Sequence, residues 1–334
     1  MDLLLKTNGF FISKKEDRFH IEIEKDGNTV KTEIPSSKVE RIILSNNGTI
    51  TTGAVSLAIE NNIPIIFLKW DDPTAMIWHC RIGKTAKTRR NQLKFSESIE
   101  GIRFASNWII KKMENQINYM KDLKKNHKHK GDFDNTIINI KNCIRELINY
   151  TDGINNKIPH REIKDTMIGI EGIASKYYFE GINYALPKNY RFKERSRRPA
   201  KDRFNALLNY GYGMLYPMVE KCLIVAGLDP YVGFIHADNY NKTTLVYDVI
   251  EMYRVHIDRG VVNFINSKKV KDNHFNTLEN GISLSDDGKG EFAPYIKDNV
   301  FKKEFYFKNK KYLLPDFIQK ECYEIAKSIR GKIL

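Results

Sequence analysis

Residues 18–34 carry a strand pattern followed by a turn and a second strand, which restricts this part of the chain to a β-hairpin. In RFHIEIE every second residue from Phe19 to Ile23 is apolar, the period of a strand with one buried face. Asp26 and Gly27 suit a tight hairpin turn, and TVKTEI supplies the partner strand. VERIIL and IPIIFLKW predict further strands around a short helix in TGAVSLAIENN, and MIWHCRI is a candidate to complete the sheet.

The pattern changes near residue 95, where helical periodicity takes over. Helices are expected over roughly 97–125, 135–151, 165–186, 200–226, 243–254 and 316–331. The sequence therefore predicts an α+β protein. A small N-terminal β-sheet domain (1–82) is followed by a basic connector (83–95) containing GKTAKTRRNQ and by a larger all-α domain (96–334). KNHKHKGDFD separates the first two helices, and its His127 and His129 indicate an exposed basic loop rather than a metal site.

The charge of the chain points to a polyanionic partner. Lys and Arg number 55 against 41 Asp and Glu, for a net charge of +14. Nucleic acid is the commonest partner of so basic a protein, although ribosome-associated and membrane-surface proteins share this composition. The four cysteines form no CxxC pair, which argues against a thiolate zinc site and favours a reducing compartment. The N-terminus does not resemble a signal peptide, and no window approaches the roughly 18 apolar residues of a membrane span. We expect a cytoplasmic protein.

One histidine and two acids stand out in GFIHADNYNKTTLVYDVIEMYR, residues 233–254. Asp248 and Glu251 are three positions apart on an expected helix, about 60° from each other and opposite its apolar face. Taken alone, they indicate two solvent-facing acids, and His236, in an apolar stretch, indicates a core histidine.

A third acid comes from MIGIEGIASKYYFEGINYAL, residues 167–186. On a helix, Glu171 falls on the flank of an apolar face that includes Ile170, Ile173 and Ala174. An ionised carboxylate is costly there unless it pairs with a base such as arginine or binds a cation. If Glu171 meets the histidine and acid of the other segment, the resulting set of oxygens and one imidazole suits Mg²⁺ or Mn²⁺.

The most basic segment is KNYRFKERSRRPAKDRFNALLNYGYGML, residues 188–215. Its arginines, including Arg197 and Arg198, are able to bind phosphates, while Asn205 and Tyr210 are of types that approach sugars and bases. A solvated basic loop is the alternative interpretation.

Together these stretches resemble one known family. IEGIASKYYF, RRPAKDRFNALLNYGYGML, GLDPYVGFIHADNYNKTTLVYDVIEMYR and RRNQ, in this order, resemble the CRISPR-associated integrases of spacer acquisition. The resemblance implies that Glu171, His236 and Glu251 bind a divalent metal, Mg²⁺ or Mn²⁺, with Glu251 where the family commonly has Asp. Asp248 would then be a further catalytic acid. The residues implied or predicted to bind DNA are Arg89, Arg90, Gln92, Arg197, Arg198, Asn205, Tyr210 and Arg254.

The resemblance also implies an assembly and a reaction. Members form homodimers through the β domain, and two dimers flank a dimer of a small ferredoxin-like CRISPR partner, with double-stranded DNA lying across the assembly. In the implied transesterification, the 3′-hydroxyl of a short foreign DNA attacks a phosphodiester at the edge of a CRISPR repeat. Two alternatives remain: a metal-dependent nuclease of branched DNA, and a non-enzymatic, basic DNA-architectural protein.

Overall fold

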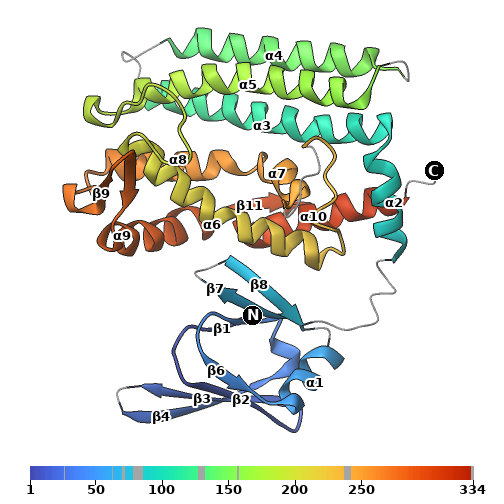
Figure 1. Cartoon of the computed structure of the whole chain (residues 1–334), viewed down its shortest axis with the longest axis vertical. Helices are drawn as coiled ribbons and strands as arrows, with labels where there is room; N and C mark the ends of the chain where they lie inside the picture. The colour runs from blue at the N-terminus through green and yellow to red at the C-terminus, as the bar shows by residue number, and fades with distance from the viewer. Residues whose placement is uncertain are drawn as a thin grey trace. The chain divides into compact units, whose positions relative to one another are not determined.

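The computed structural model of the 334-residue chain describes residues 1–25, 27–61, 63–69, 72–77, 86–126, 132–155, 158–236 and 242–331. The chain forms two compact units, Met1–Ala86 and Lys87–Leu334 (Figure 1). The described part of the expected connector lies in helix α2 (Ala86–Ser96), most of which belongs to the second unit. Thr88, Gln92 and Phe95 of α2 are buried, which explains why this basic segment is helical.

The described part of unit 1 holds two four-stranded sheets. In one, β1 (Asp2–Leu5), β5 (Arg41–Leu44) and β7 (Ile65–Lys69) are parallel, and β8 (Asp72–Ile77) pairs antiparallel with β7. The other has the order β4 (Asn28–Pro35), β3 (Arg18–Lys25), β2 (Phe10–Lys15) and β6 (Gly48–Ile50). The hairpin predicted from residues 18–34 is confirmed, because β3 and β4 pair antiparallel with Phe19 opposite Ile34. Helix α1 (Thr52–Glu60) contributes Ala54 and Leu57 to the core of this unit.

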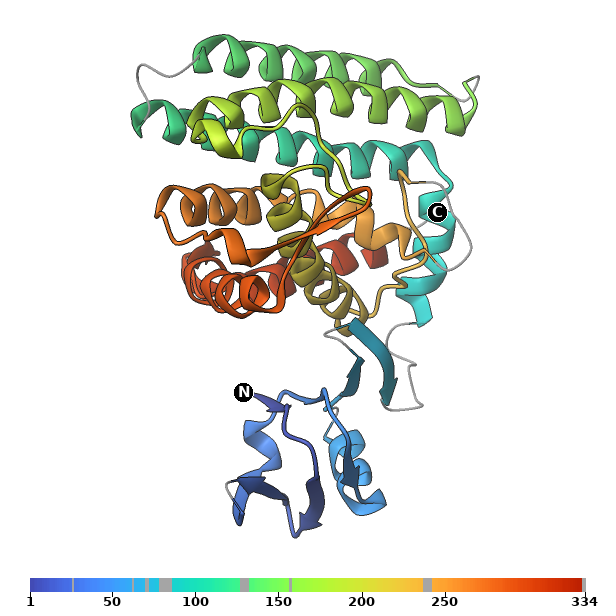
Figure 2. The ribbon, with the colours of Figure 1, turned by 60° about the vertical axis from the view of Figure 1, so that its left-hand side comes forward.

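Unit 2 is mainly helical, as expected. Its long helices are α3 (Ile99–Asn126), α4 (Phe133–Gly153), α5 (His160–Ala185) and α6 (Arg203–Val225). They are followed by α7 (Thr244–Ile250), α8 (Arg254–Asn266), α9 (Asp286–Ile296) and α10 (Leu314–Gly331). Helices α3, α4 and α5 all pack against one another, with α6 and α8 beneath them (Figures 1 and 2). His127 and His129 lie outside the described residues. In the described ranges, no helix combines the length and the apolar character needed to cross a bilayer.

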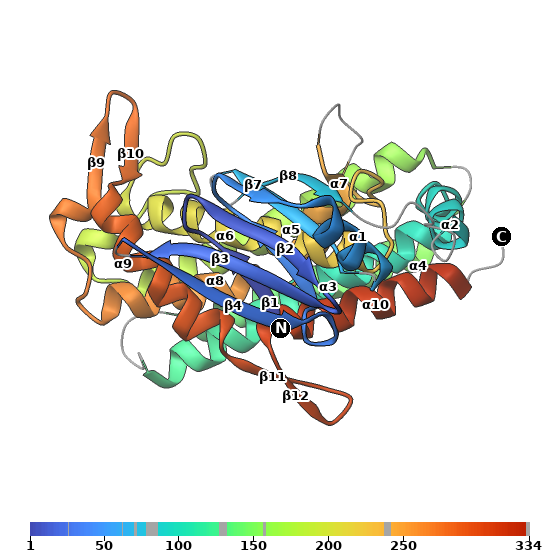
Figure 3. The same cartoon turned by 90° about the horizontal axis from the view of Figure 1, so that it is seen from below.

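Two details of unit 2 differ from the prediction. The unit is not all-α, because β9 (Phe275–Leu278) pairs with β10 (Gly281–Leu284), and β11 (Glu304–Phe307) pairs with β12 (Lys310–Leu313). Figure 3 shows both hairpins extending away from the helices of the unit. The expected helix over 243–254 is also interrupted. Residues 251–253 form a turn in which the Met252 and Tyr253 N–H groups donate to carbonyls three residues back, so Glu251 lies at the C-terminal end of α7.

Candidate active site

Two of the predicted metal ligands meet at one lysine. Glu171 on α5 accepts a hydrogen bond from Lys112 Nζ on α3 and a second, of 2.6 Å, from Ser175 Oγ one turn further along α5. Lys112 Nζ also lies 2.5 Å from Glu251 Oε2, at the end of α7. The side chains of Lys112, Glu171 and Glu251 are only 9%, 21% and 11% exposed. A single ammonium group therefore joins carboxylates from two other elements.

The burial of the residues around Glu171 on α5 agrees with the predicted apolar face, with one correction. Ile170, Ala174 and Tyr178 are buried, as an apolar face requires, but Ile173 is 50% exposed and does not belong to that face. Glu171 lies at the border between the buried and exposed sides. This position keeps its carboxylate close to neighbouring helices without enclosing it fully.

Glu251 is held as a carboxylate by two cations. Arg254, at the start of α8, forms an ion pair with Glu251 Oε1 and donates a 2.5 Å hydrogen bond to Tyr216 Oη. Burial alone would raise the pKa of Glu251, but the charges of Arg254 and Lys112 outweigh it and bring the pKa down to about 2. Burial likewise opposes the charged form of Lys112, yet the carboxylates of Glu251 and Glu171 raise its pKa. Glu251 is therefore ionised at neutral pH, and Lys112 is held in its charged form.

His236 and Asp248 form the second half of the site. Asp248 is buried, so the interpretation of two solvent-facing acids is wrong for this residue. Its Oδ2 accepts hydrogen bonds from the N–H groups of Phe234 (2.6 Å) and Ile235 (3.1 Å). Its Oδ1 accepts from the N–H of His236 (3.1 Å) and lies 2.7 Å from His236 Nδ1. This carboxylate fixes the loop and the imidazole, leaving Nε2 for another partner.

The loop before His236 packs closely against the start of α7, which requires glycine at position 233. The Gly233 N–H donates to Thr244 Oγ1 at 3.0 Å. A Cβ on Gly233 would lie 2.7 Å from Thr244 Cβ, so a larger residue would push α7 away. Gln92 of α2 also holds this segment. Its Nε2 donates hydrogen bonds to the carbonyls of Asp229 (2.9 Å) and Val232 (3.0 Å).

These two halves are close enough to interact, and His236 contributes to lowering the pKa of Glu251. In the described part of the chain, however, no three His, Cys, Asp or Glu side chains are arranged to hold a metal ion. The donors themselves fit a hard cation. Glu171 and Glu251 already converge on one positive group, the ammonium of Lys112. Glu251 Oε2 is buried and forms an ion pair with Lys112 but accepts no hydrogen bond, so it is an oxygen of the kind that a hard cation binds.

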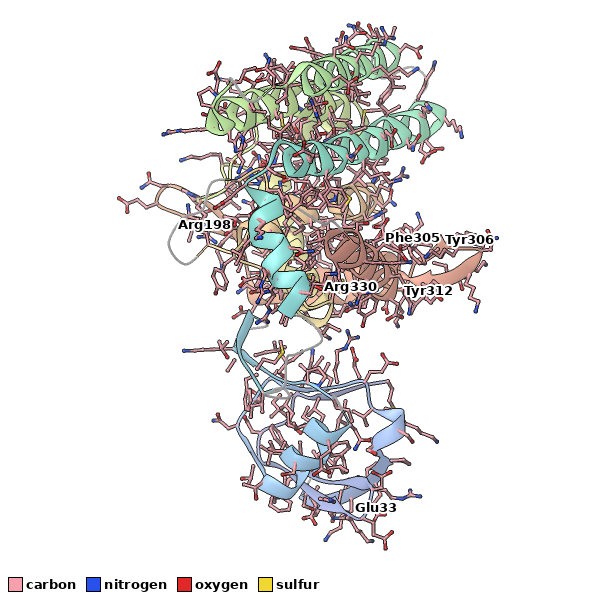
Figure 4. All side chains as sticks on the ribbon, turned by 90° about the vertical axis from the view of Figure 1, so that its right-hand side faces the viewer. Glu33, Arg198, Phe305, Tyr306, Tyr312 and Arg330 are labelled. Carbon is pink, nitrogen blue, oxygen red and sulfur yellow. The ribbon has the colours of Figure 1, made fainter. Side chains whose placement is uncertain are left out.

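The predicted DNA contacts divide into exposed and buried residues. Arg90, Arg197 and Arg198 are exposed, and Arg198 lies at the surface in Figure 4. Arg89 is half-buried, and Tyr210 is half-buried with its ring 6.2 Å from that of Phe292. For Arg89, Arg90, Arg197, Arg198 and Tyr210, DNA contact stays a prediction.

Three other residues predicted to contact DNA have partners inside the protein. Gln92 is fully buried and holds the loop before His236, as described above. Asn205 is fully buried; it accepts from the Ser196 N–H at 3.2 Å and donates to the Glu194 carbonyl at 3.0 Å, shaping the basic loop from within. The side chain of Arg254 is 14% exposed and neutralises Glu251. These contacts describe the interior roles of the three side chains, and DNA contact by Gln92, Asn205 and Arg254 stays a prediction.

Lys112 was missed by the sequence reasoning, although α3 carries a signal for it. Trp108, Ile109 and Met113 are buried on the same side of α3, so this lysine occupies a core position of the helical pattern. A lysine in such a row requires an anionic partner.

Comparison with known proteins identifies relatives over most of the chain. The family model described as "CRISPR associated protein Cas1" matches residues 3–297. The CRISPR-associated protein Cas1 3 of Methanobrevibacter ruminantium is 32% identical over 288 residues, covering 85% of this chain and 84% of that protein. The CRISPR-associated endonuclease Cas1 1 of Archaeoglobus fulgidus is 30% identical over 277 residues, covering 80% of each.

Solved structures share the fold. The chain matches a casposase bound to integration product with a TM-score of 0.71 and 22% identity, covering 99% of this chain and 96% of that one. It matches a chain of a partial Cas6-RT-Cas1–Cas2 complex with a TM-score of 0.74 and 22% identity, over the same shares. The N-terminal β unit, the helical unit and the sequence match over most of the length lead to one conclusion: this chain belongs to the Cas1 family of CRISPR-associated proteins.

Proposed function

We propose that this chain is a metal-dependent DNA integrase and endonuclease of CRISPR adaptation. The observation that carries the proposal is the convergence of Glu171 and Glu251 on one cation, beside a histidine whose ring is fixed by Asp248. Relatives named endonucleases and the fold shared with a casposase bound to its integration product support the same function.

Glu171, Glu251 and His236 Nε2 would hold Mg²⁺ or Mn²⁺. When bound, such an ion polarises a phosphodiester and lowers the barrier to in-line displacement. Asp248 keeps Nδ1 protonated by accepting its hydrogen, so that Nε2 presents a lone pair for the metal or for the proton of the attacking group. Arg254 keeps Glu251 ionised and in place.

The proposed reaction is a transesterification. A 3′-hydroxyl oxygen of a short DNA duplex forms a bond to phosphorus while the bond to the displaced 3′-oxygen of the repeat strand breaks. One phosphodiester replaces another, and the proton of the attacking hydroxyl passes to the leaving oxygen through the site. Because the number of phosphodiester bonds does not change, the reaction requires no ATP hydrolysis.

The partners are part of the proposal. DNA would lie against exposed basic residues such as Arg197 and Arg198, with the steep salt dependence of phosphate contacts. The matching complexes named Cas1–Cas2 support assembly with a small CRISPR adaptation protein, which we propose is ferredoxin-like. We further propose that the chain forms homodimers through its β unit.

A strand-transfer assay tests this function. The protein and its adaptation partner are incubated with Mn²⁺, a repeat-containing target and a labelled short duplex with 3′-hydroxyl ends. We expect a longer labelled product, and none when the duplex ends are 3′-deoxy. Cleavage of branched DNA without joined strands would instead identify a nuclease, and DNA binding without any product an architectural protein. Full strand transfer by Glu171→Ala and His236→Ala would overturn the assignment of these residues.

A further inference from the structure

The candidate metal site contains its own cation. Lys112 comes from α3, whereas Glu171 and Glu251 come from α5 and the end of α7, so the ammonium joins three separate elements. With Arg254 included, the cluster holds two positive and two negative side chains. It is balanced as it stands, and it carries no excess negative charge that would attract a divalent ion.

Both oxygens of Glu251 are engaged by cations. Oε1 faces Arg254 and Oε2 faces Lys112. Glu171 likewise uses Oε1 for both Lys112 and Ser175. A divalent ion that binds Glu251 must approach an oxygen that now faces a cation, because Mg²⁺ requires oxygens at about 2 Å. If it also binds Glu171, it enters the space beside the Lys112 ammonium, which pairs with both carboxylates.

The two cations differ in how firmly they are held. Arg254 also donates to Tyr216 Oη, and its guanidinium lies 5.1 Å from the ring centre of Tyr212 and 5.8 Å from that of Tyr216. Among the described residues, Lys112 Nζ has only the two carboxylates as polar partners. Lysine also has a flexible stem, so its ammonium is the group that is able to withdraw.

We infer that Lys112 is a tethered counter-cation that holds Glu171 and Glu251 together before metal binds, and that competes with the metal for both carboxylates. This inference rests on the proposed metal-dependent function. Lys112 is a positioning residue: it prevents repulsion between two buried carboxylates and raises the metal concentration at which the site loads. Its removal should therefore tighten metal binding while destabilising the metal-free protein.

The test measures Mn²⁺ binding by the full-length chain, by calorimetry and by the electron paramagnetic resonance signal of free Mn²⁺. We expect Lys112→Met to bind Mn²⁺ about tenfold more tightly or better, because the variant lacks the adjacent positive charge that repels the metal ion. Lys112→Arg keeps the charge and should not gain affinity. The matched control is Lys111→Met, which removes the same charge from the neighbouring, exposed position, and should bind like the wild type.

Unfolding in EDTA provides an independent measurement. Lys112→Met should lower the melting temperature, and adding Glu171→Gln to it should restore part of the loss, because the second change removes one unpaired carboxylate. Additive effects of the two changes would overturn the counter-cation role. Folded Lys112→Met protein with unchanged or weaker Mn²⁺ affinity would overturn the competition.

These outcomes also separate the inference from the proposed function. If the wild type binds Mn²⁺ and His236→Ala does not, the metal site stands. The response of Lys112→Met then decides whether Lys112 competes with the metal. If Lys112→Met binds Mn²⁺ and wild type does not, competition is supported even where strand transfer fails. If no variant binds Mn²⁺, the metal assignment and the competition are both wrong, while the EDTA cycle still decides the counter-cation role.

Discussion

Asp248 Oδ1 lies 2.7 Å from His236 Nδ1, and the carboxylate of Asp248 also accepts the backbone N–H groups of residues 234–236. One buried acid thus determines both the path of the loop and the tautomer of the imidazole. Asp248 is buried and acts through the histidine. Its role therefore depends on both carboxylate oxygens being hydrogen-bond acceptors.

Asp248→Asn tests this role. The amide retains one acceptor oxygen and introduces an N–H₂ group that faces donors, so His236 loses its fixed orientation and the loop loses a hydrogen bond. We expect a 10–100-fold loss of strand transfer or metal affinity, typical of partners that orient a metal-bound histidine, and a loss of about 1–3 kcal/mol in unfolding free energy. Strand-transfer rates and urea denaturation measure the two effects. Unchanged rates in a stable Asp248→Asn protein would contradict the positioning role.

Glu251→Gln should abolish metal binding while largely preserving DNA affinity, because the change removes a carboxylate but leaves the exposed arginines intact. Calorimetry with Mn²⁺ and gel-shift titration with duplex DNA measure the two quantities. Glu251→Asp is the matched control, since it keeps the charge with the shorter side chain that the family commonly has. Loss of both metal and DNA binding in Glu251→Gln would indicate misfolding, which circular dichroism would reveal.

Asp258 gives the unit an unusual pH response. Burial raises its pKa to about 6 from the ordinary 3.8, although Tyr212 and Tyr178 donate hydrogen bonds of 2.6 Å and 2.7 Å that oppose the shift. The folded state binds the proton more tightly than the unfolded state, so stability from this group is present at pH 4 and is lost as the pH rises to 6. The unfolding free energy that this group contributes at low pH and loses at higher pH is on the order of 3 kcal/mol.

The corresponding measurement compares wild type with Asp258→Asn by urea denaturation at several pH values between 4 and 7. We expect the wild type to lose stability relative to the variant as the pH rises through this window. His256, whose pKa is lowered to about 3 by burial and by the charges of Lys303 and Arg259, titrates in both proteins and cancels from the comparison. A difference that does not vary with pH would show that Asp258 is ionised throughout.

Arg197→Ala and Arg198→Ala should each weaken DNA binding and reduce the slope of log K against log salt by about one unit per lost phosphate contact. Both side chains are exposed, so the fold should be unaffected. The matched control is Arg161→Ala, which removes an equal charge from a side chain that is 94% exposed on α5. A slope that changes as much in Arg161→Ala as in the other two would show a general effect of net charge.

Much of the fold was predictable because it depends on local pattern. The alternation from Phe19 to Ile23, followed by a turn at Gly27, predicted a hairpin that the structure confirms with β3 and β4. The long helices of unit 2 follow the same logic, since an apolar stripe over many turns has few alternatives. The β9–β10 and β11–β12 hairpins escaped prediction because strands of four residues carry little periodic signal. In the second hairpin, the turn is made by Lys308 and Asn309 at positive φ.

By itself, the sequence determined that Glu171 flanks an apolar helix face, where a charge requires a partner whatever the fold. It singled out His236, Asp248 and Glu251 through the family resemblance, since taken alone the two acids indicated a solvent-facing side of a helix. Only the tertiary structure decided which partner each one has. It placed Lys112 between Glu171 and Glu251, turned Asp248 inward to three backbone N–H groups, and ended α7 at Ile250 so that Glu251 reaches Arg254. Pairing of charges depends on distance in space, and residues 112, 171 and 251 are brought together only when their three elements pack.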